Sequence, residues 1–166
     1  MKTYEFSIVA SGLDPKADDF EQRFYDVGCD DATISFQKGH VIVDFAREAD
    51  TAQAAIESAF DAVRRAGAVV DRVEPDPLVT LSDIASRVGI TKAAVSQYAN
   101  EKRQSGFPAP AARVTSSSSL WLWAEVVEWF VTNRVNQSIS EEALTEAKAI
   151  AGANEKVRVD RDCAPA

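Results

Sequence analysis

Polar side chains that can bind a nucleic acid recur at helical spacing between Thr91 and Asn100. Their hydroxyl and amide groups can donate and accept hydrogen bonds at base edges, and Lys92 can meet a phosphate or a guanine edge. At 3.6 residues per turn these groups share the outward face of one helix. Gln97 is the best single candidate for reading a base. The full candidate face is Thr91, Lys92, Ala93, Ser96, Gln97 and Asn100.

Basic residues surround this face in a chain that is otherwise acidic. The 166 residues carry a formal net charge of -8, and residues 1–78 account for all of the excess, with 16 acidic and 8 basic side chains. Residues 87–113 reverse the sign, because five basic side chains oppose Glu101 alone and give a local charge of +4. We expect three of the five to contact phosphates, namely Lys102, Arg103 and Arg113.

Two short helices must position the candidate face. One apolar stripe predicts a first helix from Leu81, with Thr80 or Ser82 as the N-cap and Gly89 as the stop. Thr91 can cap a second helix whose inward residues are Ala94, Val95 and Tyr98. A small residue at the crossing, a glycine in the turn and a buried aliphatic on the second helix are what a helix-turn-helix requires.

The stretch "DIASRVGITKAAVSQYANEKR" resembles the helix-turn-helix of bacterial and phage repressors. The following residues predict a β-wing, in which "AARVT" and "SLWLW" pair across the turn at Ser116–Ser118, and then a helix from Ala124 to about Asn133. "LWLWAEVVEWF" after a Gly-Phe-Pro-x-Pro step is similar to the MerR/excisionase (AlpA-like) type of winged helix-turn-helix.

This resemblance covers residues 79–134 and implies that the second helix lies in the major groove while the wing straddles the phosphate backbone. Leu122 departs from the family, which often has an arginine there, so that backbone contact is not carried over. We expect the three tryptophans to pack the wing against the helix rather than to stack on bases.

The front of the chain follows the order strand, helix, strand, strand, helix, strand. "TYEFSIVA" alternates polar and apolar residues, Phe20, Phe24 and Val27 follow a helical period, and Lys38-Gly39 joins two further strands as a tight hairpin. A second helix, capped by Asp50 or Thr51, precedes the strand "AVVDRV". This order predicts a ferredoxin-like βαββαβ domain over residues 1–76, which is suited to dimerisation, small-ligand sensing or partner binding.

Catalysis is the least supported function. Cys29, Asp30 and Asp31 cluster after Gly28, but solvated acids in a turn explain them better, and His40 has no partner nearby in sequence. One histidine and two distant cysteines make no metal site. We therefore expect no enzyme activity, cofactor or metal.

A linker is expected near residues 74–79, where Pro75 and Pro77 break the chain. A C-terminal helix over 138–152 is predicted from the capping pair Ser138 and Glu141, followed by a frayed tail over 153–166. Its stripe can pack on the winged domain or on a second subunit, and the stripe consists of Leu144, Ala147 and Ile150.

Together these features predict an α+β protein that binds double-stranded DNA as a sequence-specific transcriptional regulator, with no membrane span or secretory signal and hence a cytoplasmic location. A homodimer on two half-sites is expected, because the basic segment is small. The alternative is an adaptor or antitoxin-like protein whose front domain binds a protein partner or a small ligand.

Overall fold

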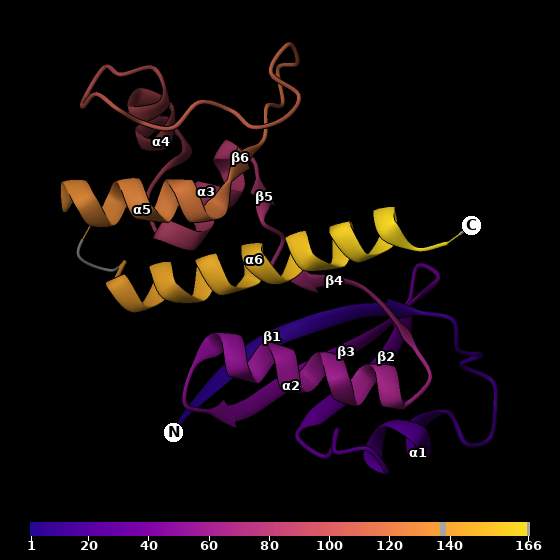
Figure 1. Cartoon of the computed structure of the whole chain (residues 1–166). Helices are drawn as coiled ribbons and strands as arrows, with labels where there is room; N and C mark the ends of the chain where they lie inside the picture. Colours follow the sequence, from indigo (N-terminus) through magenta and orange to yellow (C-terminus); the bar gives the residue numbers. More distant parts are fainter. Residues whose placement is uncertain (137–138, 166) are drawn as a thin grey trace. The chain divides into compact units, whose positions relative to one another are not determined.

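A computed structural model of the chain describes residues 1–136 and 139–165 (Figure 1). The protein is of mixed α+β class and has two compact units, which are Met1–Pro75 with Ala149–Ala166, and Asp76–Lys148. Within the described ranges, no helix combines the length and apolar character needed to cross a bilayer. Each unit has its own apolar core.

The first unit is built on a four-stranded antiparallel sheet in the order β2-β3-β1-β4. Its strands are β1 (Lys2–Ser11), β2 (Ala32–Gln37), β3 (His40–Ala49) and β4 (Val69–Glu74). The hairpin expected at Lys38 and Gly39 is present, with φ values of 50° and 81°. Positive φ at both central residues is typical of a two-residue turn that follows the twist of its strands.

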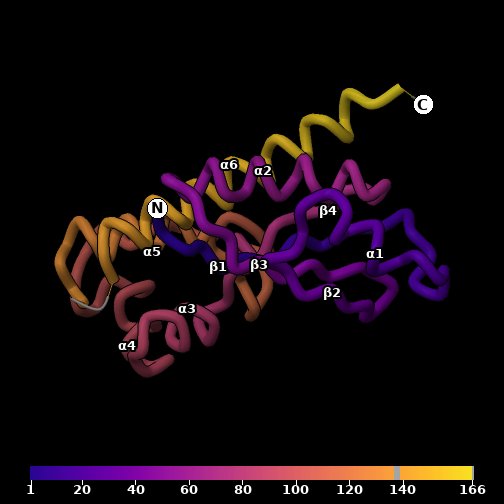
Figure 2. Tube along the Cα trace, turned by 90° about the horizontal axis from the view of Figure 1, so that it is seen from below, coloured from indigo at the N-terminus to yellow at the C-terminus, as the bar shows by residue number. Residues whose placement is uncertain are grey.

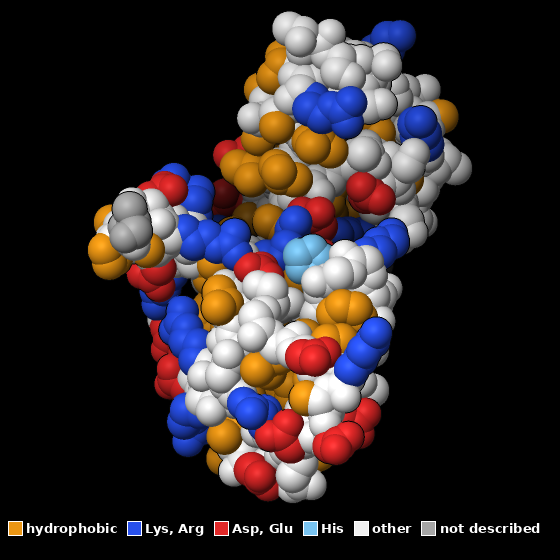
Figure 3. Space-filling model, turned by 90° about the vertical axis from the view of Figure 1, so that its right-hand side faces the viewer, with side chains coloured by type: hydrophobic (Ala, Val, Ile, Leu, Met, Phe, Trp, Pro, Cys, Tyr) orange, Lys and Arg blue, Asp and Glu red, His pale blue; other side chains and the backbone are white. Residues whose placement is uncertain are grey.

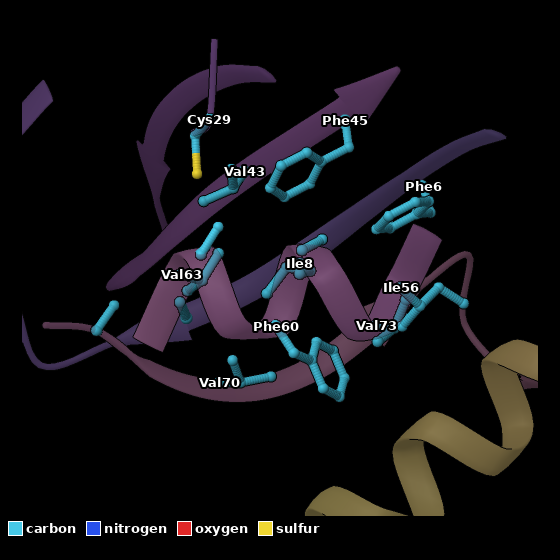
Figure 4. Close-up of a cluster of buried hydrophobic side chains, with 14 of the residues drawn as sticks. Phe6, Ile8, Cys29, Val43, Phe45, Ile56, Phe60, Val63, Val70 and Val73 are labelled. Carbon is cyan, nitrogen blue, oxygen red and sulfur yellow. The ribbon is translucent and has the colours of Figure 1, made fainter. Parts of the chain in front are cut away.

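Two helices pack on one face of this sheet. α2 (Ala52–Arg65) begins at Thr51, whose hydroxyl accepts a hydrogen bond from the Ala54 N–H. Figure 4 shows Ile56, Phe60 and Val63 of α2 meeting alternate side chains of the strands. Burying these side chains supplies the main stabilising free energy of the unit.

α1 (Phe20–Tyr25) is shorter than the spacing of its apolar residues predicts. Phe20 and Phe24 are buried in the core, but Val27 lies beyond the end of the helix. The chain turns back at Gly28, where φ is 92° and the Cys29 N–H donates to the Phe24 carbonyl. A left-handed glycine ends a helix in this way at little steric cost.

α6 (Glu141–Cys163) corrects the expected helix at 138–152 and its frayed tail. Of the expected stripe, Leu144 and Ala147 belong to the second unit, whereas Ile150 lies in the core of the first unit, which neither expected arrangement included. Ala153 and Val157 join the same core, which gives the tail a nonlocal reason to stay helical. The predicted cap Ser138 lies outside the described residues, and the Ser140 hydroxyl accepts a hydrogen bond from the Ala143 N–H instead.

Polar contacts also fix the C-terminal half of α6 in the first unit. The Asn154 side-chain amide accepts from the Val73 N–H at 2.8 Å and donates to the Val73 carbonyl at 3.0 Å, so it occupies the outer edge of β4. Figure 2 shows this half of α6 beside α2, and Lys156 pairs with Glu57 of α2 at 2.9 Å. Arg161 pairs with Asp71 of β4.

The second unit contains α3 (Leu81–Val88), α4 (Lys92–Ala99), α5 (Trp123–Asn133) and two short strands, β5 (Leu78–Val79) and β6 (Trp121–Leu122). β5 pairs with β6, so the expected linker at 74–79 contains a strand in its last two residues. The predicted wing is correspondingly shorter. Only Ala112 and Leu120 pair across it, because Trp121 and Leu122 pair with β5.

Candidate nucleic-acid interface

Local hydrogen bonds define the start and the end of α3. The Thr80 hydroxyl accepts from the Asp83 N–H, and the Asp83 carboxylate accepts from the Thr80 N–H, which forms a capping box. Gly89 ends α3 at φ 77°, and the Ile90 N–H donates to the Ala85 carbonyl. The helix ends are therefore set by hydrogen bonds within the segment itself.

The inner side of α4 rests on the core of the second unit. Thr91 begins the helix, with its hydroxyl 3.1 Å from the Ala94 N–H, as expected. Val95 is fully buried. Tyr98 is half-buried, and its ring centroid lies 5.2 Å from that of Trp129 and 6.0 Å from that of Phe130. Because this side of α4 is fixed against the core, the opposite side of the helix faces outward.

The outer side of α4 carries the predicted candidate residues with unequal exposure. Exposed positions are Thr91, Lys92, Ala93 and Asn100, whereas Ser96 and Gln97 are half-buried. The Asn100 amide donates to the Ser96 hydroxyl at 3.4 Å. Beyond the helix, the Lys102 N–H donates to the Gln97 carbonyl at 2.8 Å, so the chain turns close to Gln97. The first turn of α4 is the most open part.

A cavity of about 200 Å³, lined by polar side chains together with Leu81 and Trp121, adjoins this open end, and sequence reasoning missed it. Lys92 lines it from α4, Ser82 from the first turn of α3, and Ser117, Ser118 and Ser119 from the wing. Hydroxyl groups, a lysine and the N-terminus of a helix can together hold a phosphate oxygen. The run of serines was the available signal, but a turn was sufficient to explain it.

The wing is held by a few hydrogen bonds. The Leu120 N–H donates to the Ala112 carbonyl at 2.9 Å, and the Ser119 hydroxyl donates to the Arg113 carbonyl at 3.2 Å. Arg113 itself is exposed, with a left-handed φ of 53°. Its guanidinium is therefore open to an anion at the base of the wing turn.

Among the basic side chains of residues 87–113, Arg87 has a different role from the others. It is half-buried, its guanidinium lies 5.0 Å from the Trp123 ring centroid, and it donates to the Asp76 carbonyl at 3.1 Å. Lys102 and Arg103 are exposed directly after α4, and Arg103 lies over the Tyr98 ring. Lys92, Lys102, Arg103 and Arg113 thus supply the accessible positive charge of the segment.

Two of the tryptophans are committed to packing, as expected. The Trp121 indole N–H donates to the Pro108 carbonyl at 3.0 Å, and that of Trp129 donates to the Ser105 carbonyl at 3.3 Å. Both side chains are buried. Trp121 therefore holds the loop after α4 against β6, Trp129 holds it against α5, and both rings are closed to a base.

The polar groups of the first unit that were weighed for catalysis are Cys29, Asp30, Asp31 and His40. Cys29 points into the core (Figure 4), and burial raises the pKa of its thiol. Asp31 forms a two-point ion pair with Arg47 at 2.8 and 2.9 Å. The chain's one histidine, His40, is open to solvent (Figure 3), with its Nδ1 3.7 Å from an Asp71 oxygen. Among the described residues, no group of three or more His, Cys, Asp or Glu side chains can hold a metal ion.

A shallow depression of about 630 Å³ lies over the sheet of the first unit. Its lining includes five carboxylates, which are Glu5, Asp30, Asp31, Asp44 and Glu74. The Ser7 hydroxyl donates to Asp44 within it. This surface repels anions such as nucleic acids and suits a basic partner.

No family model, curated protein or solved structure matches the chain in comparisons with known proteins.

Proposed function

We propose that the protein is a sequence-specific DNA-binding transcriptional regulator. The observation that carries the proposal is the exposure of Thr91, Lys92, Ala93 and Asn100 on the side of α4 opposite the fully buried Val95. A helix held in this way can enter the major groove with its first turns toward the base edges. Serine hydroxyls of the wing beside Lys92 can then receive a phosphate.

In this proposal, the second unit is a winged helix-turn-helix similar to the MerR/excisionase (AlpA-like) type. Two capped helices, a turn with a left-handed glycine, and a short wing leading into α5 support this assignment. The first unit is, in the same proposal, a ferredoxin-like domain. Its strand order β2-β3-β1-β4, with both helices packed in the same core, supports that part.

The two units differ in charge, which supports a DNA-binding role for the second unit alone. The acidic first unit keeps its own surface away from phosphates, so Lys92, Lys102, Arg103 and Arg113 provide the attraction. Four cations give one subunit only a modest, salt-sensitive affinity. A homodimer that occupies two half-sites about one helical turn apart multiplies that affinity.

Binding of duplex fragments, measured by fluorescence anisotropy over a range of salt concentrations, tests the proposal. Gln97→Ala should reduce discrimination between the best fragment and random DNA by about 1 to 3 kcal/mol, with little change in salt slope. Lys102→Ala should weaken all sequences about equally and lower the slope by about one. Lys148→Ala removes the same charge from an ion pair with Glu128 and serves as the matched control.

Two results would contradict the proposal. If Gln97→Ala weakens binding to random DNA as much as binding to the best fragment, discrimination is unchanged and this residue does not read a base. Absence of binding to every genomic fragment rules out the proposed regulator, and binding with a salt slope near zero rules out phosphate contacts by the basic segment and favours the adaptor.

A second candidate function is supported by the acidic depression over the sheet of the first unit. In this alternative, the protein is an adaptor or antitoxin-like protein that binds a basic protein partner there, and DNA contact is secondary. Asp44→Lys, which reverses one exposed charge in the depression, would then abolish partner binding and leave DNA binding unchanged.

A further inference from the structure

The two edges of the sheet in the first unit differ in whether their outward backbone groups are hydrogen-bonded. At the β4 edge, Asn154 of α6 binds both the N–H and the carbonyl of Val73. At the β2 edge, no hydrogen bond from elsewhere in the described chain reaches residues 33–37 on their outer side. An edge strand with open backbone groups is a template for pairing with another strand.

The hairpin determines which groups of β2 point outward. Gln37 and His40 flank the two-residue turn and form a hydrogen-bonded pair, and such pairs alternate along an antiparallel ladder. Thr33 and Ser35 therefore bond to β3. Ile34 and Phe36 present their N–H and carbonyl groups to the outside.

β2 also lacks the features that usually block edge pairing. Its sequence ATISFQ contains no charge, proline or glycine, and the pairing of β2 with β3 has no irregularity in register. Phe36 is 48% exposed and takes no part in the core of the first unit. Exposing an uncharged strand and an aromatic ring to water is unfavourable in free energy, and such a surface often marks a protein–protein contact.

We propose that β2 is a dimerisation edge whose partner is β2 of a second copy of this chain. Antiparallel pairing about a two-fold axis at Ser35 places Phe36 of each copy opposite Ile34 of the other. About four backbone hydrogen bonds form, two for each of these two residue pairs. On the opposite face, Ser35 meets its own equivalent and Thr33 meets Gln37, so the cross-strand pairs within residues 33–37 are all uncharged.

The charges at the two ends of β2 favour this direction of pairing. The exposed Asp30 lies before the strand, next to Asp31 that is paired with Arg47, and Lys38 follows the strand. Antiparallel pairing brings Lys38 of one copy alongside the acidic end of the other, and the symmetry repeats this contact. A parallel arrangement would place like charges together at both ends.

This interface deepens the proposed function, because it specifies how the homodimer of the regulator forms. The experiment that tests the interface contains no DNA, so its result does not depend on DNA binding. Sedimentation equilibrium on the full chain measures the dimer dissociation constant directly. Phe36→Lys places a charge at the centre of the interface and should raise this constant at least tenfold. Val69→Lys is the matched control, because Val69 is 55% exposed on β4, and its constant should stay as in the wild type.

Charge reversal tests the direction of pairing. Lys38→Glu should weaken the dimer, and adding Asp30→Lys to it should restore the wild-type dissociation constant. Asp30 and Lys38 are both exposed, so both changes are compatible with folding. Failure of the double variant to recover would contradict the antiparallel arrangement.

Amide hydrogen exchange by NMR locates the contact without any variant. The N–H groups of Ile34 and Phe36 should become protected as the protein concentration rises, whereas Thr33 and Ser35 should be protected throughout. A protein that stays monomeric up to near-millimolar concentration would overturn the proposal. A dimer that leaves the Ile34 and Phe36 amides unprotected would overturn it equally.

Discussion

Replacing Asn154 with alanine removes both side-chain hydrogen bonds that cover the β4 edge. These bonds join the Asn154 amide to the Val73 N–H at 2.8 Å and the Val73 carbonyl at 3.0 Å. Each contributes about 1 kcal/mol to the free energy of unfolding, which gives about 2 kcal/mol for the pair. Alanine recovers about 0.5 kcal/mol as a better helix former, so the expected net loss is about 1.5 kcal/mol.

Urea unfolding followed by far-UV circular dichroism measures this loss, and amide exchange at Val73 gives its location. Tryptophan emission reports on the second unit alone, because Trp121, Trp123 and Trp129 all lie there. Glu155→Ala is the control. Glu155 is next to Asn154 in sequence, and its exposed side chain pairs with Arg158 at the surface. If the two variants unfold at the same urea concentration and Val73 exchanges at the wild-type rate, Asn154 does not hold this edge.

Three further predictions concern the two cores and the cap of α3. Val95→Ala should lower the free energy of unfolding of the second unit by about 2 kcal/mol, because Val95 is fully buried, as measured by tryptophan emission in urea. Hydrogen bonds from the Thr80 N–H and hydroxyl lower the pKa of Asp83 in the folded state, so its stabilising contribution is present above about pH 4 and is lost as pH falls through the lower folded value. Urea unfolding of wild type and Asp83→Ala should therefore differ at neutral pH and converge in acid. A thiol reagent should label Cys163 rapidly in the folded protein and Cys29 only after unfolding, since Cys29 is buried.

Each of these has an outcome that would contradict it. Ala93→Ser, at an exposed position of the same helix, should change stability by less than about 0.5 kcal/mol, and an equal effect from Val95→Ala would refute the packing argument. A difference between wild type and Asp83→Ala that persists in acid would rule out the ionised cap. Labelling of both thiols at one rate in the folded protein would place Cys29 outside the core.

Local signals were sufficient to predict most of the elements. Thr51, Thr80 and Thr91 each cap a helix through the side chain, as a hydroxyl before an apolar stripe predicts. Alternation at period two located the strands, and Lys38-Gly39 located the hairpin. These features depend on residues close together in sequence, so they can be read without knowing the fold.

Features that depend on distant contacts were missed. The last turns of α6 contain charged and β-branched residues with little amphipathicity, and Val157 is held there by the core of the first unit. β5 and β6 have two residues each, too few for any periodic signal. In the candidate interface, the exposed residues at the start of α4 were predicted, whereas the partial burial of Gln97 and the serine-lined cavity depend on where the loop after α4 and the wing turn back.

The first unit is interrupted in sequence, because Asp76–Lys148 separate β4 from the part of α6 that covers it. During synthesis on the ribosome, the four strands and the entire second unit emerge before Asn154 does. Until Asn154 emerges, neither edge of the newly formed sheet is covered, and the β4 edge is open to pairing with another chain.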